Sequence, residues 1–193
     1  MPELELNYFE IIGVISGLLG VWLAVRQNVW TWPVGLISVL AYTVFFYQIK
    51  LYADMGLQIF YAGSAIYGWY EWLRGGKNHT ELPVSKLSSK ARILVVLGGA
   101  IGTVALGAYF QNFTDAHYPV LDSGLAAYSL MGQFLLTRKK IENWILWFVV
   151  DVVYVWLYFQ KEAYLTASLY FVFLGMAIQG FLRWRRELKS QTA

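Results

Sequence analysis

The same stretch of sequence occurs twice in this chain. Residues 17–74 and residues 129–186 align without a gap at a constant offset of 112 positions. Residue types that seldom coincide by chance match between the copies, including Gly20 with Gly132, Trp32 with Trp144, Tyr42 with Tyr154, Gln48 with Gln160, Trp72 with Trp184 and Arg74 with Arg186. The duplication predicts a fold built from two like units and a connector. In an apolar chain, it is typical of a membrane transporter.

The composition places the duplicated chain in a lipid bilayer. Of the 193 residues, 58% are hydrophobic and only 14% are charged, whereas a soluble domain carries roughly 25% charged residues. There is no Cys, and the two His residues, His79 and His117, lie in different predicted loops. A metal site built from thiolates or imidazoles is therefore not expected, and neither is any other cofactor.

Seven apolar runs have about the length that a membrane-spanning helix needs, which is roughly 20 residues. The runs are Tyr8–Val25, Trp30–Ile49, Ala53–Leu73, Ile93–Phe110, Tyr118–Thr137, Asn143–Phe159 and Ala163–Leu182. The connections are short except for residues 74–92, whose Gly, Lys, Ser and Pro content indicates a solvated loop. We therefore expect an all-α polytopic membrane protein with seven transmembrane helices.

The basic residues fall almost entirely on one side of these spans. Of the 15 Lys and Arg residues, only Lys50 and Lys161 lie on the other side. The basic side holds Arg26, Arg74, Lys77, Lys86, Lys90, Arg92, Arg138, Lys139, Lys140, Arg183, Arg185, Arg186 and Lys189. Because cytoplasmic loops collect Lys and Arg, we expect a cytoplasmic C-terminus and an N-terminus outside. The net charge of +3 thus reflects membrane orientation, and no nucleic-acid partner is expected.

The number of spans fixes how the two copies are oriented. A unit of three spans ends on the opposite side of the membrane from its start, so a second copy in the same orientation needs one extra span before it. Ile93–Phe110 lies outside the repeat and has this position. The sequence predicts two parallel three-helix repeats joined by one linker helix, over residues 8–74, 75–117 and 118–186. In transporters of this kind, the substrate site lies between the repeats near the membrane midplane.

One span of the second copy carries a polar and aromatic stripe. The stripe contains Asn143, Trp147, Asp151, Tyr154 and Tyr158, which share one helical face, and Trp144 lies beside it. At 1.5 Å per residue, Asp151 lies about 12 Å below Asn143, close to the middle of the bilayer. A carboxylate at that depth costs on the order of 2.5–3.5 kcal/mol, so Asp151 is the first candidate for substrate binding. The alternative is that Asp151 pairs with a buried Tyr or amide and only fixes helix packing.

Other candidates lie on neighbouring spans. Gln58 and Tyr61 lie on the third span and Gln133 on the fifth, where an amide needs hydrogen-bond partners. Each of these Gln side chains either contacts substrate or bridges helices. Trp144, near the cytoplasmic boundary, suits the interfacial aromatic belt as well as substrate contact, and three further Trp residues are assigned to the belt alone. These are Trp69, Trp72 and Trp184.

The two copies differ where the stripe is deepest. Gly35 stands at the position of Trp147, and Val39 stands at the position of Asp151. Such divergence indicates one asymmetric site. Aromatic faces and a carboxylate attract a flat cation, while amides and hydroxyls can read sugar or amide groups. The interiors of the spans lack Lys and Arg, which favours an unphosphorylated ligand.

Several segments resemble the PnuC family of nicotinamide riboside transporters. They are Leu51-Tyr-Ala, Ile66-Tyr-Gly-Trp-Tyr-Glu-Trp, Asp122-Ser, Thr137-Arg-Lys and Glu142-Asn-Trp-Ile-Leu-Trp, with a Trp-x-x-Trp-x-x-x-Asn/Asp element at Trp144, Trp147 and Asp151. The resemblance implies a SWEET-like fold and uptake of unphosphorylated nicotinamide riboside by facilitated diffusion, with trapping by cytoplasmic phosphorylation. It also implies a bacterial inner-membrane protein that assembles as a trimer.

Two alternatives to this function remain at the level of sequence. Thiamine is also a flat aromatic cation and is carried by some members of the family, so Asp151 and the Trp residues do not separate the two vitamins. A membrane sensor that binds a vitamin without moving it would use the same pocket. An enzyme is not expected, because no nucleophile and base pair and no metal cluster is apparent.

Overall fold

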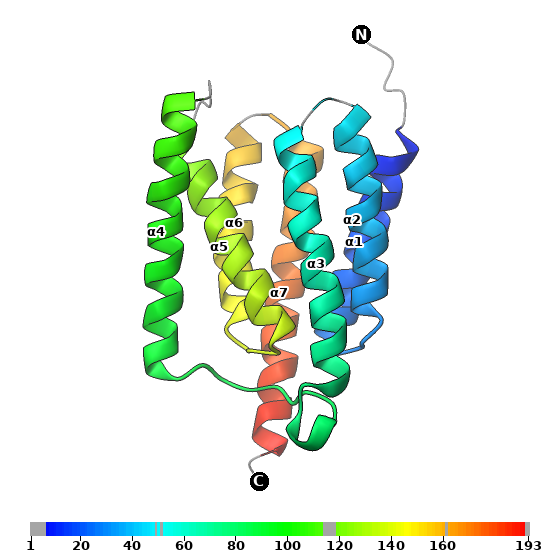
Figure 1. The fold of residues 1–193 in the computed structure, drawn as a ribbon. Helices are drawn as coiled ribbons and strands as arrows, with labels where there is room; N and C mark the ends of the chain where they lie inside the picture. The colour runs from blue at the N-terminus through cyan, green and yellow to red at the C-terminus, as the bar shows by residue number, and fades with distance from the viewer. Residues whose placement is uncertain (1–6, 49, 51, 114–118, 161, 192–193) are drawn as a thin grey trace. The chain divides into compact units, whose positions relative to one another are not determined.

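The computed structural model describes residues 7–48, 50, 52–113, 119–160 and 162–191, and most of these residues are helical (Figure 1). Helices form because backbone groups inside a bilayer must satisfy one another within the segment. The described helices are α1 (Tyr8–Val25), α2 (Thr31–Gln48), α3 (Tyr52–Arg74), the short 3-10 helix η1 (Lys77–His79), α4 (Ser89–Phe113), α5 (Pro119–Thr137), α6 (Asn143–Gln160) and α7 (Tyr164–Ser190).

The predicted spans agree closely with the long helices. The bounds of α1 are the predicted ones, but α7 continues to Ser190, past the predicted end at Leu182. The extra turns carry exposed basic side chains, which a helix leaving the membrane accommodates easily, since cations near its C-terminus interact favourably with its dipole. By length and composition, α1, α4, α6 and α7 are apolar enough to cross a membrane.

The chain divides into two compact units, Met1–Pro83 (unit 1) and Val84–Ala193 (unit 2). In unit 1, α2 packs against both α1 and α3; in unit 2, α6 packs against both α5 and α7. Helix α4 packs on α5, where the Tyr128 hydroxyl donates to the carbonyl of Val96 at 3.1 Å. The division predicted from the sequence is a different one, into a first repeat, a linker and a second repeat, with boundaries at residues 74/75 and 117/118. This division stays a prediction.

The backbone reproduces the repeat that the sequence predicted. In the turn after α1, Gln27 has a positive φ of 57°, and Lys139, 112 positions later, has a φ of 45°. Both φ values are uncommon for residues other than glycine. The amide of the residue that follows donates a 2.9 Å hydrogen bond in each turn, from Asn28 to Leu23 and from Lys140 to Leu135. The two copies therefore share their turn geometry as well as their sequence.

A tryptophan lying on a glycine holds the last two helices of each copy together. In unit 1, the Trp32 ring lies against Gly68 of α3 and meets Trp72 edge-on, with centroids 5.3 Å apart. In unit 2, Trp144 makes the same contacts with Gly180 and Trp184, with centroids 5.4 Å apart. Close approach at small residues is the usual way in which membrane helices associate.

This packing corrects the expectation that Trp72 and Trp184 belong to the interfacial belt. Their exposed fractions are 2% and 0%, so both rings are enclosed by protein, whereas Trp69 is 40% exposed. The belt assignment rested on depth alone. It could not show that the ring of Trp32 or Trp144 occupies the space above the neighbouring glycine and encloses these side chains.

In unit 2, the segment before α4 is tied to the turn between α5 and α6. The Ser85 amide donates to the Lys139 carbonyl at 3.1 Å, and the Ile141 amide donates back to the Ser85 carbonyl at 3.0 Å. The Glu142 carboxylate accepts from the Leu87 amide at 3.1 Å and lies 3.0 Å from the Arg92 guanidinium. The predicted solvated loop is therefore fastened at its C-terminal end.

Adding one methyl group at Gly180 tests the tryptophan contact. Gly180→Ala would place a β-carbon against the Trp144 ring, and overpacking of this kind costs about 1–3 kcal/mol. We expect a lower Tm of the purified protein in detergent. Gly175→Ala on the same helix is the control, because a β-carbon there meets no described atom within 4 Å. Equal Tm values for the two variants would contradict the contact.

Glu142→Gln tests the fastening of the loop. The substitution removes the ion pair with Arg92 and weakens the hydrogen bond from Leu87. Because Arg92 is half exposed, we expect a loss of only about 1 kcal/mol in stability, with faster trypsin cleavage at Lys86 and Lys90. Glu187→Gln, at an exposed position of α7, is the control. An unchanged cleavage rate in Glu142→Gln would show that this carboxylate does not hold the loop.

Candidate functional site

Asp151 of α6, which the sequence places near the middle of its span, is buried in the structure. Its exposed fraction is 4%, and within the described part of the chain no hydrogen bond or ion pair to its carboxylate is found. Burying a charge without a partner is costly, so a buried acid in a membrane helix is normally there for a ligand, an ion or a proton. The alternative was that Asp151 pairs with a buried Tyr or amide. No such partner of Asp151 is found among the described residues.

Trp147 lies one turn before Asp151 and packs against α5. A β-carbon built on Gly132 would lie 3.3 Å from the Trp147 indole. In unit 1, the equivalent glycine, Gly20, instead faces the backbone of Gly35, whose nitrogen would be 3.6 Å from such a β-carbon. The two helix backbones approach each other over a longer stretch in α1 and α2 than in α5 and α6. The exchange of Gly35 for Trp147 thus coincides with a looser helix pair in unit 2.

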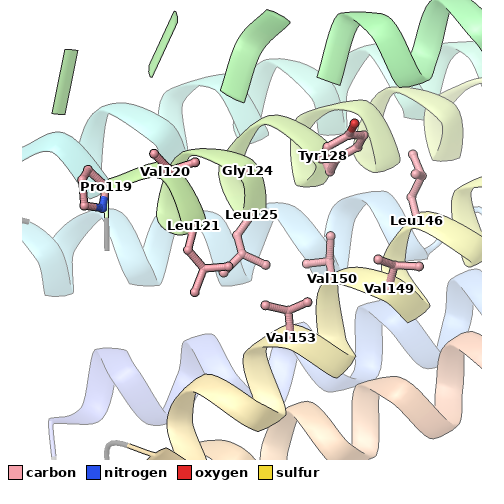
Figure 2. Close-up of a pocket in the computed structure, with 10 residues that line it drawn as sticks. All are labelled: Pro119, Val120, Leu121, Gly124, Leu125, Tyr128, Leu146, Val149, Val150 and Val153. Carbon is pink, nitrogen blue, oxygen red and sulfur yellow. The ribbon is translucent and has the colours of Figure 1, made fainter. Parts of the chain in front are cut away.

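A cavity of about 650 Å³ lies along this looser pair (Figure 2). In Figure 2, Leu121 and Leu125 of α5 point towards Val150 and Val153 of α6. The lining residues are Pro119, Val120, Leu121, Gly124, Leu125, Tyr128, Leu146, Val149, Val150 and Val153. None of them is charged, and Asp151 and Trp147 are not among them. This aliphatic cavity suits hydrocarbon, and we do not assign the cation site to it.

Tyr154, one turn beyond Asp151, belongs to an aromatic stack. Its ring lies parallel to that of Tyr170 of α7, with centroids 4.4 Å apart, and Tyr158 stacks on Tyr170 at 5.4 Å. Tyr170 was not among the predicted site residues, although the repeat offered a signal: it stands at the position of Gln58. The three rings form an aromatic surface on the C-terminal half of α6 and the N-terminal half of α7.

Asn143 and Trp144 have structural roles at the start of α6. Asn143 is fully buried, and its Nδ2 donates to the Lys140 carbonyl at 2.6 Å, which closes the turn between α5 and α6. The Asn143 Oδ1 and the Trp144 Nε1 have no hydrogen-bond partner in the part of the chain that the structure describes. Packing against Gly180 and Trp184 accounts for the burial of Trp144. Contact of either residue with substrate stays a prediction.

The remaining predicted residues are half-buried polar groups. Gln133 follows Gly132 on α5 in unit 2, while Gln58 and Tyr61 lie one turn apart on α3 in unit 1. Among the described residues, none of these three side chains has a hydrogen bond. A polar group inside a membrane is seldom left without a hydrogen-bond partner, so each of these three side chains is available to a ligand. The structure thus groups Trp147, Asp151 and Tyr154 on one face of α6 and describes Gln58 and Tyr61 as a separate pair.

Comparison with known proteins identifies related transporters. The family model described as nicotinamide mononucleotide transporter matches residues 7–186. The nicotinamide riboside transporter PnuC of Escherichia coli (strain K12) is 31% identical over 214 residues, covering 97% of this chain and 89% of that protein. The riboflavin/roseoflavin transporter RibM of Streptomyces davaonensis is 29% identical over 178 residues, covering 91% of this chain and 83% of the RibM chain.

A solved structure has the same fold. The crystal structure of the vitamin B3 transporter PnuC superposes with a TM-score of 0.73 at 24% sequence identity, covering 95% of this chain and 83% of that one. The likeness confirms the all-α transporter fold that the sequence predicted. With the family match over residues 7–186, it leads to one conclusion. The chain is a multi-pass membrane protein that belongs to the nicotinamide mononucleotide transporter family.

Proposed function

We propose that this protein takes up nicotinamide riboside by facilitated diffusion through alternating access, and that phosphorylation in the cytoplasm then traps the vitamin. The observation that carries the proposal is the buried Asp151 carboxylate, which has no described partner and lies one turn from Trp147. The relatives named for nicotinamide riboside support the same substrate.

The chemistry of nicotinamide riboside fits these side chains. Its pyridinium ring is flat and positively charged, so a carboxylate can balance the charge while an indole or phenol face packs on the ring. Helices α5 and α6 contain no Lys or Arg within their bounds, so a phosphate group would find no cation there. We therefore favour the riboside over the mononucleotide that gives the family its name.

The substrate is expected to enter a bacterial cell across its inner membrane. We propose that the N-terminus lies outside and the C-terminus in the cytoplasm, because all but two of the 15 Lys and Arg residues lie on the side of the C-terminus. A transporter also accounts for the polar residues without chemical catalysis. We therefore propose that the protein is not an enzyme.

Riboflavin is the second candidate substrate, since the RibM relative is named for riboflavin and roseoflavin. The ring system of riboflavin is neutral, so it does not need the carboxylate of Asp151. Thiamine is a cation and would benefit from Asp151, but no relative reported above is named for it. The buried acid and the names of the relatives together favour nicotinamide riboside over both.

Uptake into proteoliposomes tests the proposed function. We expect the purified protein to move radiolabelled nicotinamide riboside down its own gradient, with no ion gradient present. An excess of unlabelled nicotinamide riboside should compete, and nicotinamide mononucleotide, riboflavin and thiamine should compete less well. Flux that requires a proton gradient would contradict facilitated diffusion. Binding without any flux would instead support a sensor.

Replacing the buried acid tests its role. In Asp151→Asn, the amide keeps the shape of the side chain but cannot balance a positive charge, so we expect the Kd for nicotinamide riboside to rise tenfold or more, which corresponds to about 1.4 kcal/mol. Calorimetric titration of the purified variant measures this. Asp122→Asn, in the first turn of α5, is the control acid. Wild-type affinity in a folded Asp151→Asn protein would remove Asp151 from the site.

A further inference from the structure

The aliphatic cavity between α5 and α6 has no part in the proposed transport. Leu125 and Val150 at its base are buried, whereas Val120 and Val149 at its edge are more than half exposed. The cavity is therefore open along one side. Because lipid tails are as apolar as these side chains, a tail can enter an opening of this kind.

The polar groups along the cavity are already satisfied. Of the described residues that line it, Tyr128 alone has a polar side chain, and its hydroxyl donates to the Val96 carbonyl at 3.1 Å. The carbonyl of Pro119, at one end of the lining, accepts from the Ser123 hydroxyl at 2.6 Å. An apolar cavity of this kind does not hold water, and it offers a polar vitamin nothing to bind. Its walls suit a hydrocarbon chain.

Comparison of the two copies shows why the space exists in unit 2. In unit 1, the Ser38 hydroxyl of α2 donates to the Gly13 carbonyl of α1 at 2.7 Å, which ties the two helices together. At the offset of 112 positions, Val150 stands in place of Ser38 and Leu125 in place of Gly13. Two aliphatic side chains cannot form this bond, and they are larger. The cavity thus lies where unit 2 has bulk in place of a bond between helices.

The cavity is long enough for a lipid chain. Figure 2 shows Pro119 and Leu146 at opposite ends of the lining; Pro119 begins α5, and Leu146 lies three residues after the start of α6. The lining therefore extends along most of the helix pair, and the 19 residues of α5 span about 28 Å at 1.5 Å per residue. An acyl chain covers about half of a hydrocarbon core roughly 30 Å thick, so it fits within this length.

Two routes lead from the cavity to Arg92. The Leu146 amide donates to the Glu142 carbonyl at 3.2 Å, and the Glu142 carboxylate lies 3.0 Å from the Arg92 guanidinium. The Tyr128 hydroxyl, in turn, binds the carbonyl of Val96, which lies one turn after Arg92 on α4. Arg92 is therefore within about one helical turn of the end of the cavity.

This end of the cavity carries surplus positive charge. Lys86, Lys90 and Arg92 are all exposed, and Glu142 balances one of the three. They belong to the side of the protein that we propose to be cytoplasmic. Basic pockets between membrane helices on that side suit the head groups of anionic lipids. A hydrocarbon-lined cavity that ends at a cationic group has the chemistry of an anionic phospholipid: an apolar tail joined to a phosphate.

We propose that unit 2 binds one anionic phospholipid, with an acyl chain in the cavity between α5 and α6 and the phosphate beside Arg92 and Lys90. The chain packs on Leu125 and Val150 and fills the space between the two helices. The positive charge favours this lipid over a second copy of the chain, whose net charge of +3 is also positive. The inference goes beyond the proposed transport and does not depend on which compound is carried.

Matched substitutions test the two parts of the site. Val149→Trp fills the cavity from its exposed edge, and Val152→Trp is its control, because Val152 is also exposed on α6 but is not part of the lining. Arg92→Gln removes the charge at the phosphate, with Arg185→Gln, at an exposed position of α7, as its control. Size-exclusion profiles and Tm values show whether each variant is folded, and Val149→Phe replaces Val149→Trp if the larger side chain prevents folding.

Native mass spectrometry of the purified protein counts the bound lipid. The probes are phosphatidylglycerol, which is anionic, and phosphatidylethanolamine with the same acyl chains, which is zwitterionic. We expect one phosphatidylglycerol for each wild-type chain and a higher Tm when this lipid is added, because a ligand that binds the folded state stabilises it. Val149→Trp should weaken binding of both lipids about tenfold or more, while Val152→Trp should bind as the wild type does.

The head-group position is tested by opposite effects at one ion pair. Arg92→Gln should remove the preference for phosphatidylglycerol, whereas Glu142→Gln should keep or increase it, because Arg92 then has no carboxylate to balance. Arg185→Gln should leave the preference unchanged. If the pair served only to hold the loop, the Arg92 and Glu142 variants would behave alike, and that result would overturn the proposed position of the phosphate.

Equal lipid binding by folded Val149→Trp and Val152→Trp proteins would show that no acyl chain lies in the cavity. If Val149→Trp also changed the oligomeric state in size-exclusion chromatography with light scattering, the cavity would belong to an interface between copies of this chain. Either result overturns the lipid site. Neither bears on uptake of nicotinamide riboside by the wild-type protein, which is measured separately.

Discussion

The contact of an indole ring with a bare helix backbone, made once in each copy, is the constraint on which the rest of this structure depends. Inside a bilayer, lipid tails are as apolar as the side chains, so helices gain little from hiding hydrophobic surface and associate mainly through close packing. Gly68 and Gly180 let Trp32 and Trp144 lie flat against the neighbouring helix. This contact sets the register of the helix pair and therefore decides which side chains meet further along it.

The sequence predicted the elements well because membrane helices are governed by length and apolarity. The span Tyr8–Val25 has the same bounds in the structure, and the duplication appears again in the φ angles of Gln27 and Lys139. Asp151 was predicted to lie near the middle of the bilayer, since its distance from the start of its helix gives its depth, while its burial by neighbouring side chains is a finding of the structure. The end of α7 was not predicted, because polarity marks where a span leaves the lipid, whereas the helix itself ends at Ser190.

The misassigned residues are those whose surroundings depend on another helix. From their positions in the sequence, Trp72 and Trp184 were expected in the interfacial aromatic belt. In the structure, each of them is enclosed with the help of a second Trp. The stack of Tyr170 on Tyr154 likewise depends on the register between two helices, which no single run of residues contains. Comparing the copies partly overcomes this limit. A scaffold that recurs with different residues at Gly35 and Trp147, or at Gln58 and Tyr170, indicates where the two copies have separate tasks.

The fastening of the loop before α4 has a consequence for how the chain is made. Within unit 1, the described helices pack on their neighbours in the sequence, so this packing can form as soon as α3 has left the ribosome. Leu87 and Ser85, in contrast, bind side chains that lie 55 residues later, at Glu142 and Lys140. The loop is therefore synthesised well before its partners exist, and it reaches its final position only after α5 has been inserted and the next turn has formed.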